Sequence, residues 1–363
     1  MKYIDEYRNK KLAGVLSKKI KEIMPLSGIR LMEVCGTHTH NFFRFGLDKI
    51  LPQSLKLISG PGCPVCVSPQ EYIDKALSLV KNKDVIIATF GDMIRIPGTS
   101  STLEKERARF GNVRAVYSPL DSLQLAKNNP DKKIVFLGVG FETTIPTIAI
   151  SILLAKKEKL KNIYFLNSLK LIPPALDFLM KDKSVEIDGF LCPGHVSAII
   201  GTNAYEFIPR KYKIGCCIAG FEPLDILEGI YLLVQQKVRK KAKVLNQYSR
   251  VVTSLGNKRA LGIIKRVFTI KDSSWRGLGI IPGSGLEVRK ELSCFDADKH
   301  FSLKTCIEKS GHKKTRCRCG DVLKGKIQPD ECRLFRRLCT PENPYGPCMV
   351  SNEGACNAYY KYH

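Results

Sequence analysis

The chain from about residue 29 to residue 225 alternates between short apolar runs and longer amphipathic segments. The apolar runs have the length and composition of strands and are Ile29–Val34, Leu55–Ser59, Val85–Thr89, Ala115–Tyr117, Ile134–Val139, Ile163–Asn167, Gly189–Leu191 and Tyr212–Ala219. The segments between them predict helices, among them Glu71–Lys81, Asp121–Asn128, Thr147–Lys157 and Pro173–Met180. Short buried strands that alternate with helices are typical of parallel sheets covered on both faces. The pattern therefore predicts an α/β protein.

The flanking segments complete a prediction of domains. Residues 1–28 predict an amphipathic helix that packs on the body, and residues 226–246 predict a long helix that leaves it. The strand count indicates two α/β units, with Asp-Lys-Lys at 131–133 as their divider. We expect α/β domain I at 29–130, α/β domain II at 131–225, and a linker helix with a mainly helical or irregular C-terminal domain at 226–363. The glycine-rich segment Trp275–Glu291 is interpreted as a structured connection.

Composition narrows the class of protein. A chain of 363 residues is too long for one ordinary core. It has no 18-residue apolar span and no pattern of a cleaved signal peptide, so we expect a cytoplasmic protein without a membrane partner. Fourteen cysteines are many for that setting. Because a reducing compartment disfavours disulfide staples, the count indicates metal binding or redox chemistry.

The formal net charge of +25 has two interpretations, a surface for nucleic acid or an acidic partner, and a lysine-rich surface without a specific partner. The lysines are scattered, with concentrations only at 237–243 and between Lys304 and Arg337. Neither concentration is interleaved with the aromatic residues that single-strand binding requires. We therefore do not expect a nucleic-acid partner, although a zinc-stabilised nucleic-acid binder is kept as an alternative.

The densest candidate chemistry lies between Leu31 and Cys66. Cys35, His38 and His40 follow the first predicted strand, and thiol and imidazole groups suit iron, zinc or copper. The alternative is a buried cysteine with two hydrogen-bonded histidines. Cys63 and Cys66 form a CxxC pair after the second strand.

A CxxC pair at the mouth of an α/β unit favours thiol–disulfide chemistry. A helix predicted to begin near Ser68 would stabilise a thiolate there. The alternative, half of a zinc site, would require a second CxxC or HxxH in the α/β body, and the sequence has none.

Two further loops follow apolar strands, GVGFETT at 138–144 and CPGHVSAIIG at 192–201. Glu142 and His195 are placed to enter the same crevice as acid, base or partners of a metal ligand. Each loop could instead be a helix N-terminal turn with a packing role. Neither contains a nucleotide-binding motif.

The C-terminal cysteines Cys317, Cys332, Cys339 and Cys356 have the spacing C-x14-C-x6-C-x16-C, with Cys294, Cys306, Cys319 and Cys348 before or among them. Four separated thiolates in a segment poor in core residues fit an iron–sulfur cluster or a zinc site. The long gaps favour the cluster, because zinc sites usually use tight CxxC pairs.

Seven motifs in order resemble the HypD family of [NiFe] hydrogenase maturation factors: CGTHTH, GPGCPVC, GDMIRIPG, GFETT, CPGHVS, WRGLGIIPGSGL and CTPENPYGPCMVSNEGACNAYY. The resemblance implies two α/β domains and a third domain in which Cys317, Cys332, Cys339 and Cys356 hold a [4Fe-4S] cluster. It also implies a complex with a HypC-type chaperone and a HypE-type cyanide donor.

By the same resemblance, that complex assembles the Fe(CN)2CO unit, an iron carrying cyanide and carbon monoxide. Cys35 is implicated in holding this iron, and Cys63 and Cys66 in redox steps supplied by the cluster. Some members have acidic residues where this chain has Thr39 and His40. The main alternative is a free-standing iron–sulfur thiol–disulfide oxidoreductase resembling a thioredoxin reductase.

Overall fold

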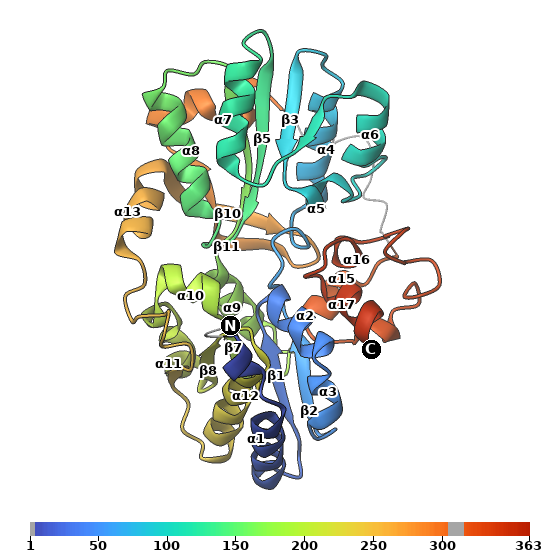
Figure 1. The fold of residues 1–363 in the computed structure, drawn as a ribbon, viewed down its shortest axis with the longest axis vertical. Helices are drawn as coiled ribbons and strands as arrows, with labels where there is room; N and C mark the ends of the chain where they lie inside the picture. Colours follow the sequence, from blue (N-terminus) through green and yellow to red (C-terminus); the bar gives the residue numbers. More distant parts are fainter. Residues whose placement is uncertain (1–3, 304–315) are drawn as a thin grey trace.

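The computed structural model describes residues 4–303 and 316–363, so Cys306 lies outside the described residues. It confirms the α/β class, with two parallel sheets and an irregular C-terminal region. In Figure 1 one sheet lies in the lower half of the molecule and the other in the upper half, with the C-terminal segment beside them.

Sheet A has five parallel strands. In spatial order they are β2 (Leu55–Ser59), β1 (Ile29–Glu33), β7 (Gly189–Pro193), β8 (Gly215–Ala219) and β9 (Val244–Asn246). The residues of β7 and β8 are buried throughout, as expected for interior strands covered by helices on both faces.

Sheet B has four parallel strands. In spatial order they are β4 (Val113–Ala115), β3 (Val85–Thr89), β5 (Lys133–Gly140) and β6 (Ile163–Leu169). After Lys133, every residue of β5 is buried, which explains its continuous apolar run.

The strand pairing does not follow the predicted division at residue 130. Sheet A combines residues 29–59 with residues 189–246, and sheet B is built from the chain between them. Asp-Lys-Lys at 131–133 is therefore no divider, since Lys133 begins β5 and pairs with Val85 of β3. The physical reason is that an apolar run predicts a buried parallel strand without indicating which sheet it joins.

Helices connect the strands and cover the sheets. Their bounds are α1 (Lys10–Ile23), α2 (Gly36–Arg44), α3 (Leu47–Ile50), α4 (Gln70–Val80), α5 (Gly91–Ile94), α6 (Leu103–Phe110), α7 (Pro119–Asn128), α8 (Ile145–Lys157), α9 (Ile172–Lys181), α10 (Gly194–Ile200), α11 (Phe207–Tyr212), α12 (Pro223–Val238) and α13 (Lys258–Val267). Local signals set their starts: Ser118 and Asp121 form a capping box for α7, with Pro119 in its first turn. In the described ranges no helix has the length and apolar character needed to cross a bilayer.

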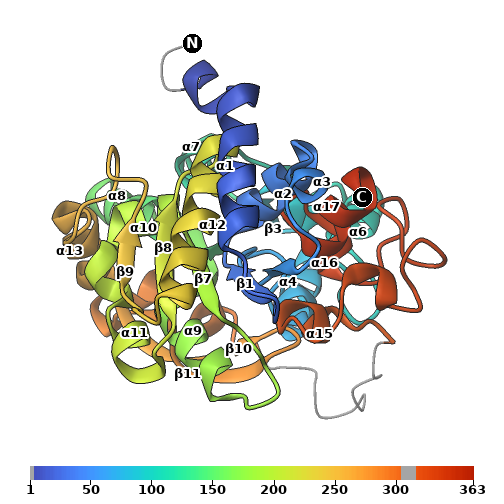
Figure 2. The same ribbon diagram turned by 90° about the horizontal axis from the view of Figure 1, so that it is seen from below.

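The helix predicted at 226–246 differs in the structure. It begins at Pro223, ends at Val238, and packs on β8 and α1, as the two views of the molecule show (Figures 1 and 2). The chain then returns to sheet A as β9. The helix does not leave the body, because its apolar face is buried against the sheet.

Trp275–Glu291 contributes to an antiparallel hairpin of β10 (Phe268–Trp275) and β11 (Gly279–Val288). A bulge between Lys271 and Ser273 shifts its register. Lys170, just after β6, forms a bridge with Gly285 and attaches the hairpin to sheet B.

The C-terminal segment, defined as residues 316–363, has only short helices. They are α15 (Cys319–Leu323), α16 (Pro347–Val350) and α17 (Ala355–Tyr362), preceded in the body by α14 (Ala297–His300). Its own cluster of buried side chains consists of Leu334, Phe335, Cys339, Met349 and Tyr359. α17 packs on α2, which brings the end of the chain beside the Cys35 loop.

Candidate functional site

Four neighbouring strands of sheet A deliver the candidate site. The segments that follow the carboxyl ends of β2, β1, β7 and β8 carry, respectively, Cys63 and Cys66, Cys35, His195 in the first turn of α10, and Phe221. Ligands of parallel α/β sheets bind at this edge because the strand ends and the helix N-termini meet there. The position of the site therefore follows from the topology of sheet A.

Cys35 is buried and occupies the N-cap position of α2. The loop carrying Cys63 packs directly against it, backbone on backbone. A Cβ on Gly62 would lie 2.2 Å from the Cys35 nitrogen, so only glycine fits there. The amide of Gly36 also donates a hydrogen bond to the carbonyl of Gly62 at 3.2 Å. These contacts fix the thiol beside the CxxC loop.

One histidine contacts Cys35, and a second lies on the helix that Cys35 caps. The Cys35 sulfur lies 3.9 Å from Nε2 and 4.0 Å from Nδ1 of His195. His38, one turn into α2, is fully buried, and its Nε2 donates to the carbonyl of Gly220 at 2.8 Å. Its Nδ1 is buried without a hydrogen-bond partner in the described structure. With the proton on Nε2, the Nδ1 lone pair of His38 is free to bind a metal.

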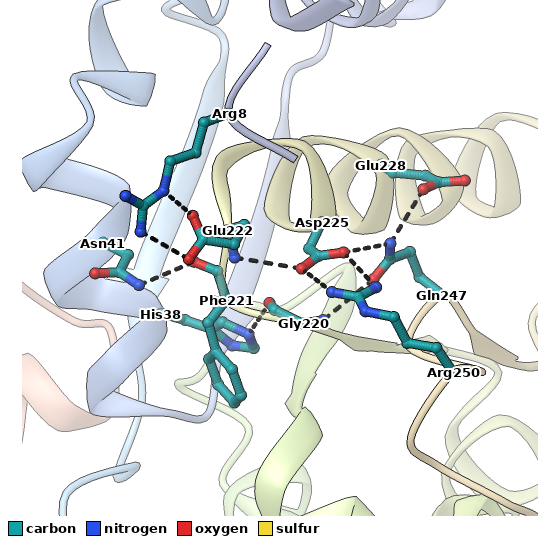
Figure 3. A network of polar contacts seen from close by, with 10 residues as sticks. All are labelled: Arg8, His38, Asn41, Gly220, Phe221, Glu222, Asp225, Glu228, Gln247 and Arg250. Carbon is teal, nitrogen blue, oxygen red and sulfur yellow. Dashed lines mark hydrogen bonds and ion pairs between the residues drawn. The ribbon is translucent and has the colours of Figure 1, made fainter. Parts of the chain in front are cut away.

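Phe221 packs against both imidazoles. Its ring centroid lies 5.0 Å from that of His38 and 5.1 Å from that of His195. The network in Figure 3 supports the Phe221 loop: Asn41 donates to the Phe221 carbonyl, and fully buried Asp225 accepts two bonds from Arg250, at 2.9 and 2.6 Å. The network thus holds the aromatic ring, and through it the two histidines.

Burial favours the neutral forms of the thiol and the two imidazoles of the site. Burial lowers the pKa of both His38 and His195 to about 4. Burial, followed by the charges of Glu353 and Glu33, raises the pKa of the Cys35 thiol well above its usual value. A bound cation reverses that shift, because it stabilises the thiolate that it coordinates.

The structure adds two carboxyl groups that the sequence analysis missed. Glu33, at the end of β1, accepts hydrogen bonds from the Cys35 amide at 3.1 Å and from the Thr39 hydroxyl. Burial raises its pKa to about 8. Glu353, from the C-terminal segment, accepts a bond from Thr37 at 2.7 Å. Glu33 lies two residues before Cys35 in an apolar strand, and this charged residue in a buried run was the available signal.

His40 points away from the site. Its Nδ1 lies 3.3 Å from the Asn352 carbonyl, and its ring contacts Tyr362. Residues two positions apart in a helix point to nearly opposite sides, so His38 and His40 lie on separate surfaces of α2. Of these two histidines, only His38 faces the Phe221 loop.

Cys63 and Cys66 form a buried disulfide. The Cys66 sulfur lies 3.7 Å from the carbonyl oxygen of Pro347, in the C-terminal segment. The following helix, α4, begins at Gln70, close to the predicted start. The pair therefore sits between the Cys35 loop and the C-terminal cysteines.

Glu142 lies in another place. It follows β5 of sheet B, and its Oε1 accepts a hydrogen bond from the Ile172 amide at the start of α9 at 2.9 Å. Its Oε2 is buried without a hydrogen-bond partner in the described ranges, and burial raises its pKa to about 7. No hydrogen bond among the described residues joins Glu142 to Cys35 or His195. Glu142 follows a strand of sheet B and His195 a strand of sheet A, and the shared crevice expected for them stays a prediction.

Cys317, Cys332, Cys339 and Cys356 gather in one cluster of the C-terminal segment, packed with Phe335 and Tyr359. Burial, followed by the nearby thiols Cys317, Cys319, Cys339 and Cys332, raises the pKa of Cys356 well above its usual value. Gly346 permits the close packing, since a Cβ there would lie 2.5 Å from the Cys317 sulfur. The fold thus brings together four thiols that are far apart in the sequence.

These four thiols fit the donor set of an iron–sulfur cluster, which cysteines normally hold. In the ranges 4–303 and 316–363, no group of three or more His, Cys, Asp or Glu side chains is arranged to hold a metal ion. A zinc ion requires all its sulfurs at about 2.3 Å from one point. A cluster spreads its thiolates over several irons, so the looser arrangement is compatible with it.

Cys319 and Cys348 were not assigned a role from the sequence. Cys317 and Cys348 lie close enough to Cys319 to shift the pKa of its thiol, and the two shifts have opposite directions. Cys348 directly follows Pro347, whose carbonyl contacts Cys66. Cys319 and Cys348 therefore lie in the region between the four cysteines of the C-terminal segment and the CxxC pair. Short cysteine spacing was the only sequence signal for this arrangement.

An α/β protein with a buried thiol–imidazole site and a cysteine-rich C-terminal segment is the class that fold and site define. The family model "HypD: Hydrogenase formation hypA family" matches residues 11–363. The chain is 45% identical over 372 residues to "Hydrogenase maturation factor HypD" of Escherichia coli (strain K12), covering all of this chain and 98% of that protein. It is 43% identical over 370 residues to the protein of the same name from Azotobacter vinelandii, covering all of this chain and 97% of that protein.

The chain belongs to the HypD family of hydrogenase maturation factors.

Proposed function

We propose that this protein is a redox-active scaffold in the cytoplasm that assembles the Fe(CN)2CO unit of [NiFe] hydrogenases. It acts together with a HypC-type chaperone and a HypE-type cyanide donor. Iron is cargo in this proposal, bound at Cys35 and passed on when the unit is complete.

The observation that carries the proposal is the donor set at Cys35. The Cys35 thiol lies within 4.0 Å of the His195 imidazole, and burial keeps both His195 and His38 neutral. The buried Nδ1 of His38 has no hydrogen-bond partner in the described ranges. Cyanide and carbon monoxide require a low-spin ferrous iron, and thiolate and imidazole ligands suit that ion. Iron binding displaces the Cys35 proton, so the raised pKa of the free thiol makes loading dependent on a proton acceptor.

The neighbouring cysteine pair stores electrons when its disulfide is reduced. Reduction of Cys63–Cys66 takes up two electrons and two protons and yields two thiols next to the iron-binding loop. The [4Fe-4S] cluster that Cys317, Cys332, Cys339 and Cys356 would hold supplies one-electron chemistry. Cys319 and Cys348 pack in one buried cluster with Cys63 and Cys66, where thiols are suited to exchange with the disulfide.

Infrared spectroscopy of the complex with the HypC-type partner, purified without oxygen, tests the proposal. We expect cyanide and carbon monoxide bands in the wild-type complex and their loss in Cys35→Ala. Cys294→Ala is the matched control, because Cys294 is an exposed free thiol outside the site. Bands that survive unchanged in Cys35→Ala would contradict the proposal.

The alternative of a free-standing thiol–disulfide oxidoreductase predicts sustained reduction of thiol substrates by the isolated protein. Burial weighs against it, since Cys63 is 3% exposed and Cys66 is not exposed at all. A disulfide substrate of a partner protein could not reach these sulfurs without rearrangement of the loop.

A further inference from the structure

A large cavity lies at the carboxyl end of sheet B. Its volume is about 890 Å³, within the range of small-molecule sites. Its walls come from the end of β6, the hairpin β10–β11, the first turn of α4 and residues Cys317–Asp321. Cys35, His38 and His195 are not among the described residues that line it, so it is separate from the iron-binding site proposed above.

Lys170 is the unusual residue of this cavity. It lies in the wall yet is only 2% exposed. Its ammonium donates to the hydroxyl of Ser273, and no carboxylate forms an ion pair with it in the described ranges. Lysine is almost never this buried unless it is paired, because desolvation of its charge is costly. Burial, followed by repulsion from Lys271, lowers its pKa to about 7.

Of the acidic residues of the cavity, Glu71 acts on the charge of Lys170, although it forms no ion pair with it in the described ranges. Three of the four already have partners: Asp298 binds Lys75 at 2.6 Å, Asp321 binds Arg318 at 2.8 Å, and Asp272 accepts from the Gly283 amide at 2.8 Å. Among the described residues, the wall as a whole has five basic residues and four acidic ones: Lys75, Lys170, Lys271, Arg276 and Arg318 against Glu71, Asp272, Asp298 and Asp321. Basic residues therefore outnumber acidic ones by one, and Lys170 is the buried one among them.

A second buried group points to a ligand. The Ser168 hydroxyl, two residues before Lys170 in β6, is 5% exposed and has no hydrogen-bond partner in the described part of the chain. Ser168 and Lys170 both line the cavity. The N-terminus of α4, an 11-residue helix, contributes to the wall through Pro69, Gln70 and Glu71. Helix N-termini favour negative charge.

We propose that this cavity binds a small anionic molecule, a carboxylate or a phosphate, whose charge pairs with Lys170. The Ser168 hydroxyl donates a hydrogen bond to the same ligand. Such a molecule would lie against Cys317 and Cys319, which also line the cavity, and its binding would connect sheet B with the C-terminal segment. The inference depends only on the cavity and would stand if the iron site were elsewhere.

Calorimetric titration of the full-length protein tests the inference. The probes are inorganic phosphate, pyrophosphate, acetate and succinate, each at matched ionic strength against chloride. We expect one chemical class to bind, and the series separates phosphate from carboxylate ligands. Lys170→Met keeps the length of the side chain without its charge, and should weaken binding about tenfold or more, because a charge-assisted hydrogen bond is lost.

Ser168→Ala provides a second variant and should weaken binding by a smaller factor without altering charge. Lys105→Met is the control, since Lys105 is exposed on α6, outside the cavity. Circular dichroism establishes that each variant is folded. If Lys170→Met does not fold, Ser168→Ala decides the test. Equal binding to wild type and to the folded variants would overturn the inference, as would the absence of binding by all four probes at millimolar concentration.

Discussion

The α/β body and the C-terminal segment are held together in different ways. In the body, the site residues directly follow buried strands. Backbone contacts hold these residues in place, as the contact between Gly62 and Cys35 does. The C-terminal segment has helices of only five, four and eight residues. Cysteines make up much of its interior, since Cys339 is in its core and Cys317, Cys332 and Cys356 pack against that core.

This difference indicates a division of labour. The body stabilises its own site with buried apolar strands and a paired carboxylate, so the Cys35 site is organised by the protein itself. The C-terminal segment has too few apolar residues to do the same and would gain most of its stability from the cofactor that its thiols hold. Three perturbations separate these two modes, in order of expected effect.

The largest effect is expected for Cys332→Ser. Cys332 is only partly buried, so loss of its sulfur changes packing little but removes one proposed cluster ligand. We expect loss of iron and sulfide and destabilisation of the C-terminal segment by more than about 5 kcal/mol. Limited proteolysis with mass spectrometry should then place new cuts within residues 316–363. Cys294→Ser, at an exposed thiol, should cause neither change, and full retention of iron in Cys332→Ser would argue against the comparison.

The body should respond instead to Arg250→Met. The substitution leaves the fully buried Asp225 carboxylate without its ion-pair partner, and breaking a buried pair costs about 4 kcal/mol. Denaturant unfolding of the body should show this loss, while the iron content of the C-terminal segment is unchanged. Arg8→Met is the matched control, because the guanidinium of Arg8 is exposed and its pair with Glu222 should contribute much less to stability. If Arg250→Met and Arg8→Met lowered the unfolding free energy equally, the buried Arg250–Asp225 pair would not stabilise the body as stated.

The smallest effect is a pH dependence removed by Glu142→Gln. The folded protein raises the pKa of Glu142 from 4.5 to about 7, so its contribution to stability is complete below pH 4.5 and is lost as the pH rises through 7. Relative to the variant, wild type should lose about 3 kcal/mol over this window. Unfolding free energies measured across the window check the slope. Glu104→Gln, at an exposed position, should keep the pH dependence of wild type. Parallel curves of unfolding free energy against pH for wild type and Glu142→Gln would contradict the prediction.

Local patterns predicted local features well. The apolar runs before Cys35 and Gly60 become the neighbouring strands β1 and β2, and the loops after them meet as expected. The proposed cluster cysteines were selected by spacing and resemblance, and the structure gathers all four. In these cases the information lies within a short stretch of chain or in the cysteine pattern itself.

Long-range pairing was less accessible. The strand β9 was hidden at the end of a predicted helix, because three residues are too few to display a period of two. The hairpin β10–β11 was interpreted as a connection, since its glycines and proline resemble those of a loop. Cys319 and Cys348 acquired a place only when the fold brought them together with Cys66.

By itself the sequence determined the α/β class, the thiols and imidazoles available for chemistry, and the strand ends that present them. Only the tertiary structure decided which of these groups meet. It placed Glu142 and His195 after strands of different sheets, turned His40 away from the site, and left Lys170 buried in a cavity wall without an ion-pair partner in the described ranges. The reason is physical: periodicity records whether a residue is buried, whereas its neighbours depend on how distant strands pair and how the C-terminal segment packs against them.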